Sequence, residues 1–115
     1  MSSSWEEADY RKKVQETLNR IEVAFSDVDP DVAECEMIFG ALTVTLSNGS
    51  RFILSQQPSV RQIWLALAAQ GTAHHFNYDA QKGQWFDDKG KGIELIAFVK
   101  GYFKEFCRLD LVIGG

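Results

Sequence analysis

The sequence predicts an α+β domain in which two helices pack on one face of an antiparallel sheet of five or six strands. Three observations lead to this fold class. Apolar residues have helical spacing near both ends of the chain, apolar and polar residues alternate in the middle, and turn sequences separate the alternating segments. Because the chain has 115 residues and 45% of them are hydrophobic, we expect a single domain with one filled core.

A first helix is expected from about Ser4 to Phe25, with Ser3 or Ser4 as its cap. Apolar residues recur in it at steps of three and four, which gives one apolar stripe along the helix. The stripe consists of Tyr10, Val14, Leu18, Ile21 and Phe25. Pro30 follows in the segment SDVDPD and cannot continue the helix, because proline has no amide proton.

Strands are expected between about residues 34 and 88. In ALTVTL, apolar residues alternate with threonines, and Asn48-Gly49 predicts a two-residue hairpin turn into SRFILSQ. Further candidates are RQIWLA, HHFNYD and GQWFDD, although LALAAQG is also compatible with a helical turn. Alternation predicts that one set of side chains faces the helices: Leu42, Val44, Ile63, Leu65, Phe76 and Phe86. The opposite set faces away from them: Gln62, Trp64, His75, Asn77 and Trp85.

A closing helix is expected from about residue 92 to residue 107. Its apolar stripe consists of Ile93, Ile96, Val99, Phe103 and Phe106. The tail, residues 108–115, reads RLDLVIGG and is apolar enough that we expect it to pack in the groove between the two helices. The side chains expected to be buried there are Leu109, Leu111 and Ile113.

One segment accounts for the whole net negative charge of the chain. The net charge is −4, and residues 22–36 hold six acids and no Lys or Arg, so the rest carries 10 acids against 12 bases. These acids are Glu22, Asp27, Asp29, Asp31, Glu34 and Glu36. Such a field disfavours nucleic acids and anionic membranes, and it attracts cations or a basic protein surface. Three interpretations stay open: a weak site for hard cations, a solvated edge that aids solubility, and a docking patch.

Other features narrow the class of function. The start MSSSWEEADYRKK does not have the pattern of a signal peptide, and no apolar run is long enough for a membrane span. Cys35 and Cys107 are expected to be buried, reduced thiols. The expected compartment is therefore the cytoplasm. No nucleophile elbow or phosphate-binding loop occurs, and His74 and His75 point to opposite faces of a strand, so they cannot hold one metal ion together.

Two exposed tryptophans, Trp64 and Trp85, are more than the solubility of a sheet face requires, so their predicted exposure indicates an interaction surface. The alternative is that the strand phase is shifted by one residue and that both belong to the core. For the third strand, such a shift would expose Ile63 and Leu65 together.

Taken together, AECEMIFGALTVTLSNGSRFILSQQ, PSVRQIWLA, HHFNYD followed by GQWFDDK, and the apolar final helix resemble the frataxin family, most nearly its bacterial CyaY type. The resemblance covers about Tyr10 to Phe106, and its most specific part is QIWL after a proline, with a second tryptophan in GQW. It implies a two-layer α+β sandwich, iron binding at an acidic ridge, and a role in iron–sulfur cluster assembly with the cysteine desulfurase and the scaffold protein.

Carried over by position, the resemblance maps the iron-binding ridge to Glu22, Asp27, Asp29, Asp31, Glu34 and Glu36. It maps the partner-binding sheet surface to Gln57, Gln62, Trp64, His75 and Trp85. The chain departs from the family where the first helix ends, because Val23, Ala24, Phe25 and Ser26 stand where carboxylates are typical, so the ridge is thinner.

The expected function is that of an iron-binding accessory protein, monomeric without metal, that supplies Fe2+ or Fe3+ or regulates sulfur release. The main alternative is a metal-independent interaction module that uses the acidic patch and the exposed tryptophan face. Other divalent cations are expected to bind as well. Enzymatic activity is not expected, and weak oxidation of Fe2+ by oxygen is the most distant alternative.

Overall fold

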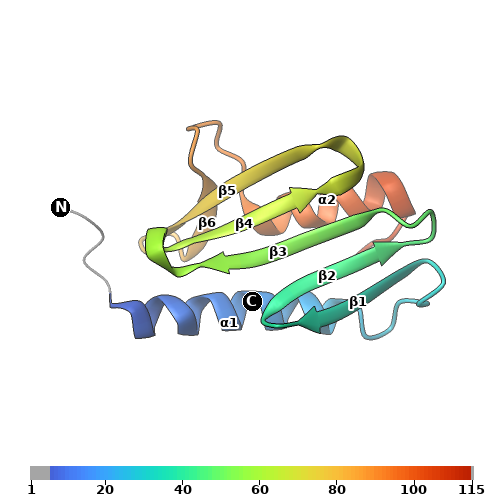
Figure 1. Cartoon of the computed structure of the whole chain (residues 1–115), viewed down its shortest axis with the longest axis horizontal. Helices are drawn as coiled ribbons and strands as arrows, with labels where there is room; N and C mark the ends of the chain where they lie inside the picture. The colour runs from blue at the N-terminus through green and yellow to red at the C-terminus, as the bar shows by residue number, and fades with distance from the viewer. Residues whose placement is uncertain (1–5, 115) are drawn as a thin grey trace.

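The structure is a computed structural model that describes residues 6–114. It confirms the predicted α+β class, with two helices on one face of a six-stranded antiparallel sheet (Figure 1). The helices are α1 (Glu7–Ala24) and α2 (Leu95–Cys107), and neither, within the described range, is long and apolar enough to cross a membrane. The strands are β1 (Ala33–Ile38), β2 (Ala41–Leu46), β3 (Arg51–Gln57), β4 (Gln62–Leu67), β5 (Thr72–Asp79) and β6 (Gln84–Asp87).

Each strand pairs with the next one along the chain, so the sheet order is β1-β2-β3-β4-β5-β6. Two short 3-10 helices, Pro58–Val60 and Ala68–Gln70, connect β3 to β4 and β4 to β5. The second of them is the helical turn that LALAAQG allowed. The predicted two-residue turn at Asn48-Gly49 is wrong, because the Leu46 amide donates to the Ser50 carbonyl across three loop residues, with Gly49 at a φ of +88°.

The core lies between the helices and one face of the sheet. The predicted stripe of α1 is buried from Tyr10 to Phe25, and the inward residues of β4, Ile63 and Leu65, are fully buried. On α2 the stripe is shifted toward Tyr102, which is buried, whereas Phe106 is 52% exposed and contacts the Tyr102 ring at the edge of the core. Phe106, expected in the apolar stripe of this helix, therefore lies at the edge of the core and not within it.

The phase predicted for β6 is also wrong. Trp85 pairs with Tyr78 and faces the helices, and Phe86 pairs with Asn77 and faces outward. The cause is the loop between β5 and β6: Asp79 pairs with Gln84, which fixes the register so that Trp85 shares a face with Tyr78. The Trp85 indole donates to Thr17 Oγ1 of α1 at 3.0 Å, so this tryptophan locks the helix to the sheet.

The tail packs onto the helical side of the molecule as expected. Leu111 is buried, and Leu109 and Ile113 pack partly against the core. Near the end of the chain, the Gly114 carbonyl accepts a hydrogen bond from Arg20 of α1, which fixes the tail beside that helix.

Candidate functional site

Trp64 lies at the centre of the sheet face that no helix covers. It is half-buried, because its indole stacks on the His75 imidazole of the neighbouring strand, with 4.2 Å between ring centroids and 15° between the planes. The indole nitrogen donates to Gln62 Oε1 at 2.7 Å. The ring is therefore held in one orientation while part of its surface remains open to a partner.

Polar side chains extend this arrangement toward β6. Gln62 Nε2 lies 3.2 Å from both Asn77 Oδ1 and Asp88 Oδ2, and His75 Nδ1 lies 3.6 Å from the same Asp88 oxygen. Asp88 was not among the residues predicted from the sequence. The only signal for it is its position directly after β6, and that signal requires the correct β6 register.

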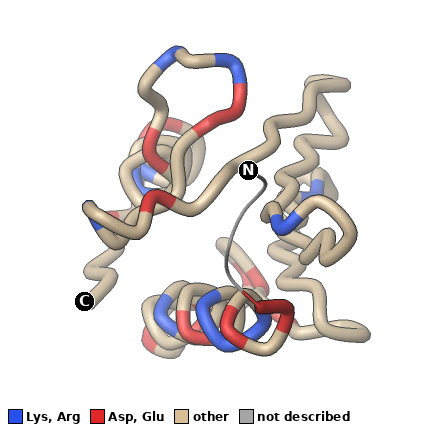
Figure 2. Tube along the Cα trace, turned by 90° about the vertical axis from the view of Figure 1, so that its left-hand side faces the viewer, with Lys and Arg blue, Asp and Glu red and all other residues tan. Residues whose placement is uncertain are grey.

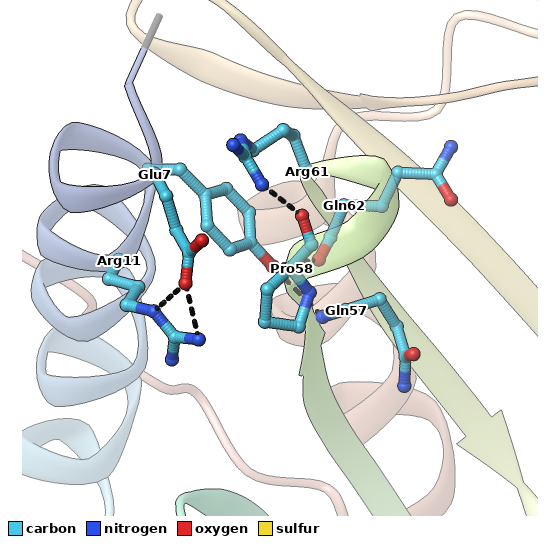
Figure 3. Close-up of polar contacts among 7 residues, drawn as sticks. Glu7, Arg11, Gln57, Pro58, Arg61 and Gln62 are labelled. Carbon is cyan, nitrogen blue, oxygen red and sulfur yellow. Dashed lines mark hydrogen bonds and ion pairs between the residues drawn. The ribbon is translucent and has the colours of Figure 1, made fainter.

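Gln57 lies opposite Gln62 in the β3–β4 pair, at the end of the sheet where Tyr10 fastens α1 to the turn. The Tyr10 hydroxyl accepts from the Gln57 amide at 2.9 Å and donates to the Gln62 carbonyl. The Arg61 guanidinium lies 5.9 Å from the centre of the Tyr10 ring and donates to the Pro58 carbonyl (Figure 3). Helix α1 thus fixes the backbone from which Gln57 and Gln62 project.

Trp85 does not belong to this surface, contrary to the sequence-based expectation, because it is only 2% exposed. The corresponding outward position is occupied by Phe86, whose ring lies 5.0 Å from Lys82 Nζ. We name the outward surface formed by Gln57, Gln62, Trp64, His75, Asn77 and Phe86 the open face.

The six predicted acids lie at the other side of the sheet, where α1 ends and β1 begins. Glu22 is in the last turn of α1, Asp27, Asp29 and Asp31 are in the following loop, and Glu34 and Glu36 are on β1. The Asp29 side chain accepts the Asp31 amide at 2.9 Å, which shapes the loop. Figure 2 looks along α1 and shows basic segments among the acidic ones on this helix. We name these six residues the acidic edge.

The structure brings only part of the acidic edge together. Glu22, Glu34 and Cys35 line one open groove of about 510 Å³. Asp31 lines a separate depression beside Cys107 and Arg108. Asp27 and Asp29 are exposed on the loop and line neither of these two hollows.

The pKa of the Cys35 thiol reflects the burial and the negative charge of this groove. Burial raises the pKa of its thiol most, and the carboxylates of Glu22 and Glu36 raise it further, to about 12. Burial also raises the pKa of the Cys107 thiol. Both cysteines are free and half-buried, so at neutral pH they are protonated and poor metal ligands.

A preformed metal cage is not found within residues 6–114, where no three His, Cys, Asp or Glu side chains are close enough to hold one ion. The acidic edge instead offers separate carboxylates, which suit hard cations such as iron. A cation bound there would keep most of its water ligands, so binding by this edge is expected to be weak.

The comparisons with known proteins agree with this architecture. Residues 3–108 match the family described as the frataxin-like domain. A protein of Pseudomonas fluorescens (strain Pf0-1), named iron-sulfur cluster assembly protein CyaY, is 39% identical over 88 residues, covering 76% of this chain and 77% of that protein. The protein of the same name from Azotobacter vinelandii is 39% identical over 95 residues, covering 81% and 84%.

Solved structures show the same fold. A frataxin from Psychromonas ingrahamii superposes with a TM-score of 0.83 at 19% identity, covering 96% of this chain and all of that one. The trimeric frataxin of Saccharomyces cerevisiae, in a structure with ferrous iron, superposes with a TM-score of 0.61 at 22% identity, covering 95% and 92%. The match to the family and the curated relatives show that this chain belongs to the frataxin-like family.

Proposed function

We propose that this protein takes part in iron–sulfur cluster assembly as a non-enzymatic accessory protein of the cytoplasm. Support comes from relatives of 39 to 40% identity, which are named iron-sulfur cluster assembly protein CyaY. The partners proposed are the cysteine desulfurase and the scaffold protein, on which the protein docks with its open face and acidic edge.

The observation that carries this proposal is Trp64, an orientated and partly exposed tryptophan on a face without helices. Tryptophan is enriched among the residues that dominate binding energy at protein interfaces. Folding does not require it there, because Ile63 and Leu65 fill the core side of the same strand. The rings and amides around it fix its orientation before a partner binds, which lowers the entropy lost on docking.

Iron is proposed as cargo, bound weakly at the acidic edge. The yeast relative was solved with ferrous iron, and carboxylates match the preference of iron for hard oxygen ligands. Since the carboxylates are separated, the protein is expected to deliver iron to a partner or to adjust sulfur release there, rather than to store the metal.

A second candidate function is a metal-independent interaction module. It is favoured by the separation of the carboxylates, because an acidic edge without a cage can still attract a basic protein surface and raise the association rate. In this case neutral variants of the acidic edge would weaken partner binding in the presence of a chelator.

The test is a reconstituted reaction containing purified desulfurase and scaffold protein, to which this protein is added. Cluster formation is followed in an arm with Fe2+, and sulfide release by the desulfurase is followed in an arm without Fe2+, in chelator. The proposal predicts a change in the initial rate of cluster formation. Unchanged rates in both arms would contradict it. A change in sulfide release as large as the change in cluster formation would favour the metal-independent module.

A further inference from the structure

The turn between β1 and β2 displays an aromatic side chain at its tip. Ile38 pairs with Ala41, so the loop consists of two residues, Phe39 and Gly40. Phe39 is fully exposed, and the preceding Ile38 is 44% exposed. Within residues 6–114 this tip therefore presents two adjacent apolar side chains to solvent.

The backbone makes Phe39 an unfavourable choice for this turn. Phe39 and Gly40 both have positive φ, +51° and +79°. Two-residue hairpin turns of this kind favour Asn-Gly, and a bulky residue with positive φ is strained. Phe39 is too exposed for packing to offset this strain. Such a strained and exposed residue is better explained by an interaction with another molecule than by folding.

The surroundings of the tip indicate what kind of molecule this is. β1 is an edge strand, and alternation places Ile38 on the same side of it as Glu34 and Glu36. An apolar tip is therefore continued by two exposed carboxylates along one strand. A complementary surface has an apolar pocket for the tip and basic residues beside that pocket.

We propose that Phe39, supported by Ile38, inserts into an apolar pocket of a partner protein whose rim carries Lys or Arg side chains facing Glu34 and Glu36. The inference rests on the proposed function, since it takes that partner to be the desulfurase–scaffold complex. Charge argues against a second copy of this chain, because two such edges would bring Glu34 and Glu36 close to their own equivalents. Insertion of the ring would remove about 200 Å² of aromatic surface from water.

The test variant is Phe39→Asn, which removes the ring and creates the favoured Asn-Gly turn. We expect its melting temperature to rise by roughly 2 to 4 °C, because Asn tolerates positive φ better than Phe. We expect its affinity for the purified desulfurase–scaffold complex, measured by calorimetry, to fall about tenfold. Phe39→Gly serves as a second variant, since a Gly-Gly turn also accepts this backbone.

Two controls separate the contribution of the Phe39 ring to binding from those of other exposed apolar side chains and of the neighbouring charges. Val112→Asn removes another exposed apolar side chain, in the tail, and should leave affinity unchanged. Glu34→Gln/Glu36→Gln should weaken binding at low salt only, whereas the loss in Phe39→Asn should persist at high salt, because salt screens charges and not apolar contacts.

The outcomes are distinguishable. If the wild-type protein does not bind the complex, the proposed function fails. If the wild type binds and Phe39→Asn and Phe39→Gly bind equally well, the inference about the tip is overturned. A fall in melting temperature for both variants would overturn it as well, since Phe39 would then serve folding. Dimerisation of the wild type that Phe39→Asn abolishes would make a second copy the occupant and contradict the proposal.

Discussion

The Trp64 indole stacks face to face on the His75 imidazole with 4.2 Å between ring centroids, so side chains of two neighbouring strands hold each other's rings nearly parallel on the open face. The Trp64 ring nitrogen is engaged by Gln62, and His75 in turn lies beside Asp88. The orientation of Trp64 is thus determined by strand pairing, by the stacked His75 ring and by the hydrogen bond to Gln62.

Trp64→Ala is expected to separate binding from stability. Because the ring is half-buried and lies outside the core, the free energy of unfolding should change by less than about 1.5 kcal/mol. Affinity for the desulfurase–scaffold complex should fall at least about tenfold, as measured by calorimetry. Phe106→Ala, which truncates an exposed aromatic on α2, is the matched control and should leave affinity unchanged.

Trp85→Phe is expected to act on stability instead. It removes the hydrogen bond to Thr17 Oγ1 and part of the ring that packs against Tyr10 and Tyr78, which should cost about 1 to 3 kcal/mol in chemical denaturation. In a double-mutant cycle with Thr17→Val, a coupling energy near zero would show that this hydrogen bond does not lock α1 to the sheet.

The contrast between these tryptophans shows what the sequence could and could not predict. On β4, Ile63 and Leu65 alternate with Trp64, so the apolar pattern alone determined the phase correctly. On β6, Trp85 and Phe86 are adjacent and both apolar, so alternation could not choose between them. The choice is made by the Asp79–Gln84 pairing across the loop, which is tertiary information.

Prediction from the sequence was limited in the same way for the candidate site. Glu34 and Glu36 were correctly expected on one exposed face, because period-two geometry depends only on their being in a strand. The sequence grouped Asp31 with the other acids, whereas in the structure it lines the depression beside Arg108 and not the groove of Glu22 and Glu34. The loop conformation determines which carboxylates lie close together, and the number of acids in the sequence does not reveal that conformation.

Tyr10→Phe tests how α1 supports the open face. Removal of the hydroxyl leaves the Gln57 amide and the Gln62 carbonyl without this hydrogen bond, which should destabilise the fold by about 1 to 3 kcal/mol. Hydrogen exchange measured by NMR should show faster exchange at the Gln57 amide. The exposed change Gln15→Ala on the same helix should leave that exchange rate unaltered.

The Cys35 thiol should react slowly with iodoacetamide at pH 8, because its pKa of about 12 leaves little thiolate. Burial is the main cause, and the carboxylates of Glu22 and Glu36 add to it. In a Cys107→Ser background, Glu22→Gln and Glu36→Gln should therefore increase the alkylation rate. An unchanged rate in both variants would show that these carboxylates do not act on the thiol.

The same pKa shift has a consequence for stability. The thiol pKa rises from 9.0 to about 12 on folding, so the unfolded chain loses this proton first as pH increases. The contribution of the neutral thiol is fully present below pH 9 and is lost between pH 9 and 12. Denaturation curves across this range should show a steeper loss of stability for the Cys107→Ser protein than for the Cys35→Ser/Cys107→Ser protein.

Leu111→Ala is expected to lower the free energy of unfolding by about 2 to 3 kcal/mol, because this side chain of the tail is buried in the core. Deletion of residues 109–115 should remove on the order of 3 kcal/mol and lower the melting temperature by roughly 10 °C. Val112→Ala, which changes an exposed neighbour, should have almost no effect. A truncated protein that melts like the full chain would contradict the packing of the tail.

The most direct test of the account is a backbone-amide NMR titration of the isotopically labelled protein, with Fe2+ in one series and with the purified desulfurase in another. The account predicts that Fe2+ perturbs only the acidic edge, and that the desulfurase perturbs the acidic edge together with Gln62, Trp64 and His75. Desulfurase-dependent changes confined to the outer surface of α2, around Gly101 and Phe106, would contradict it.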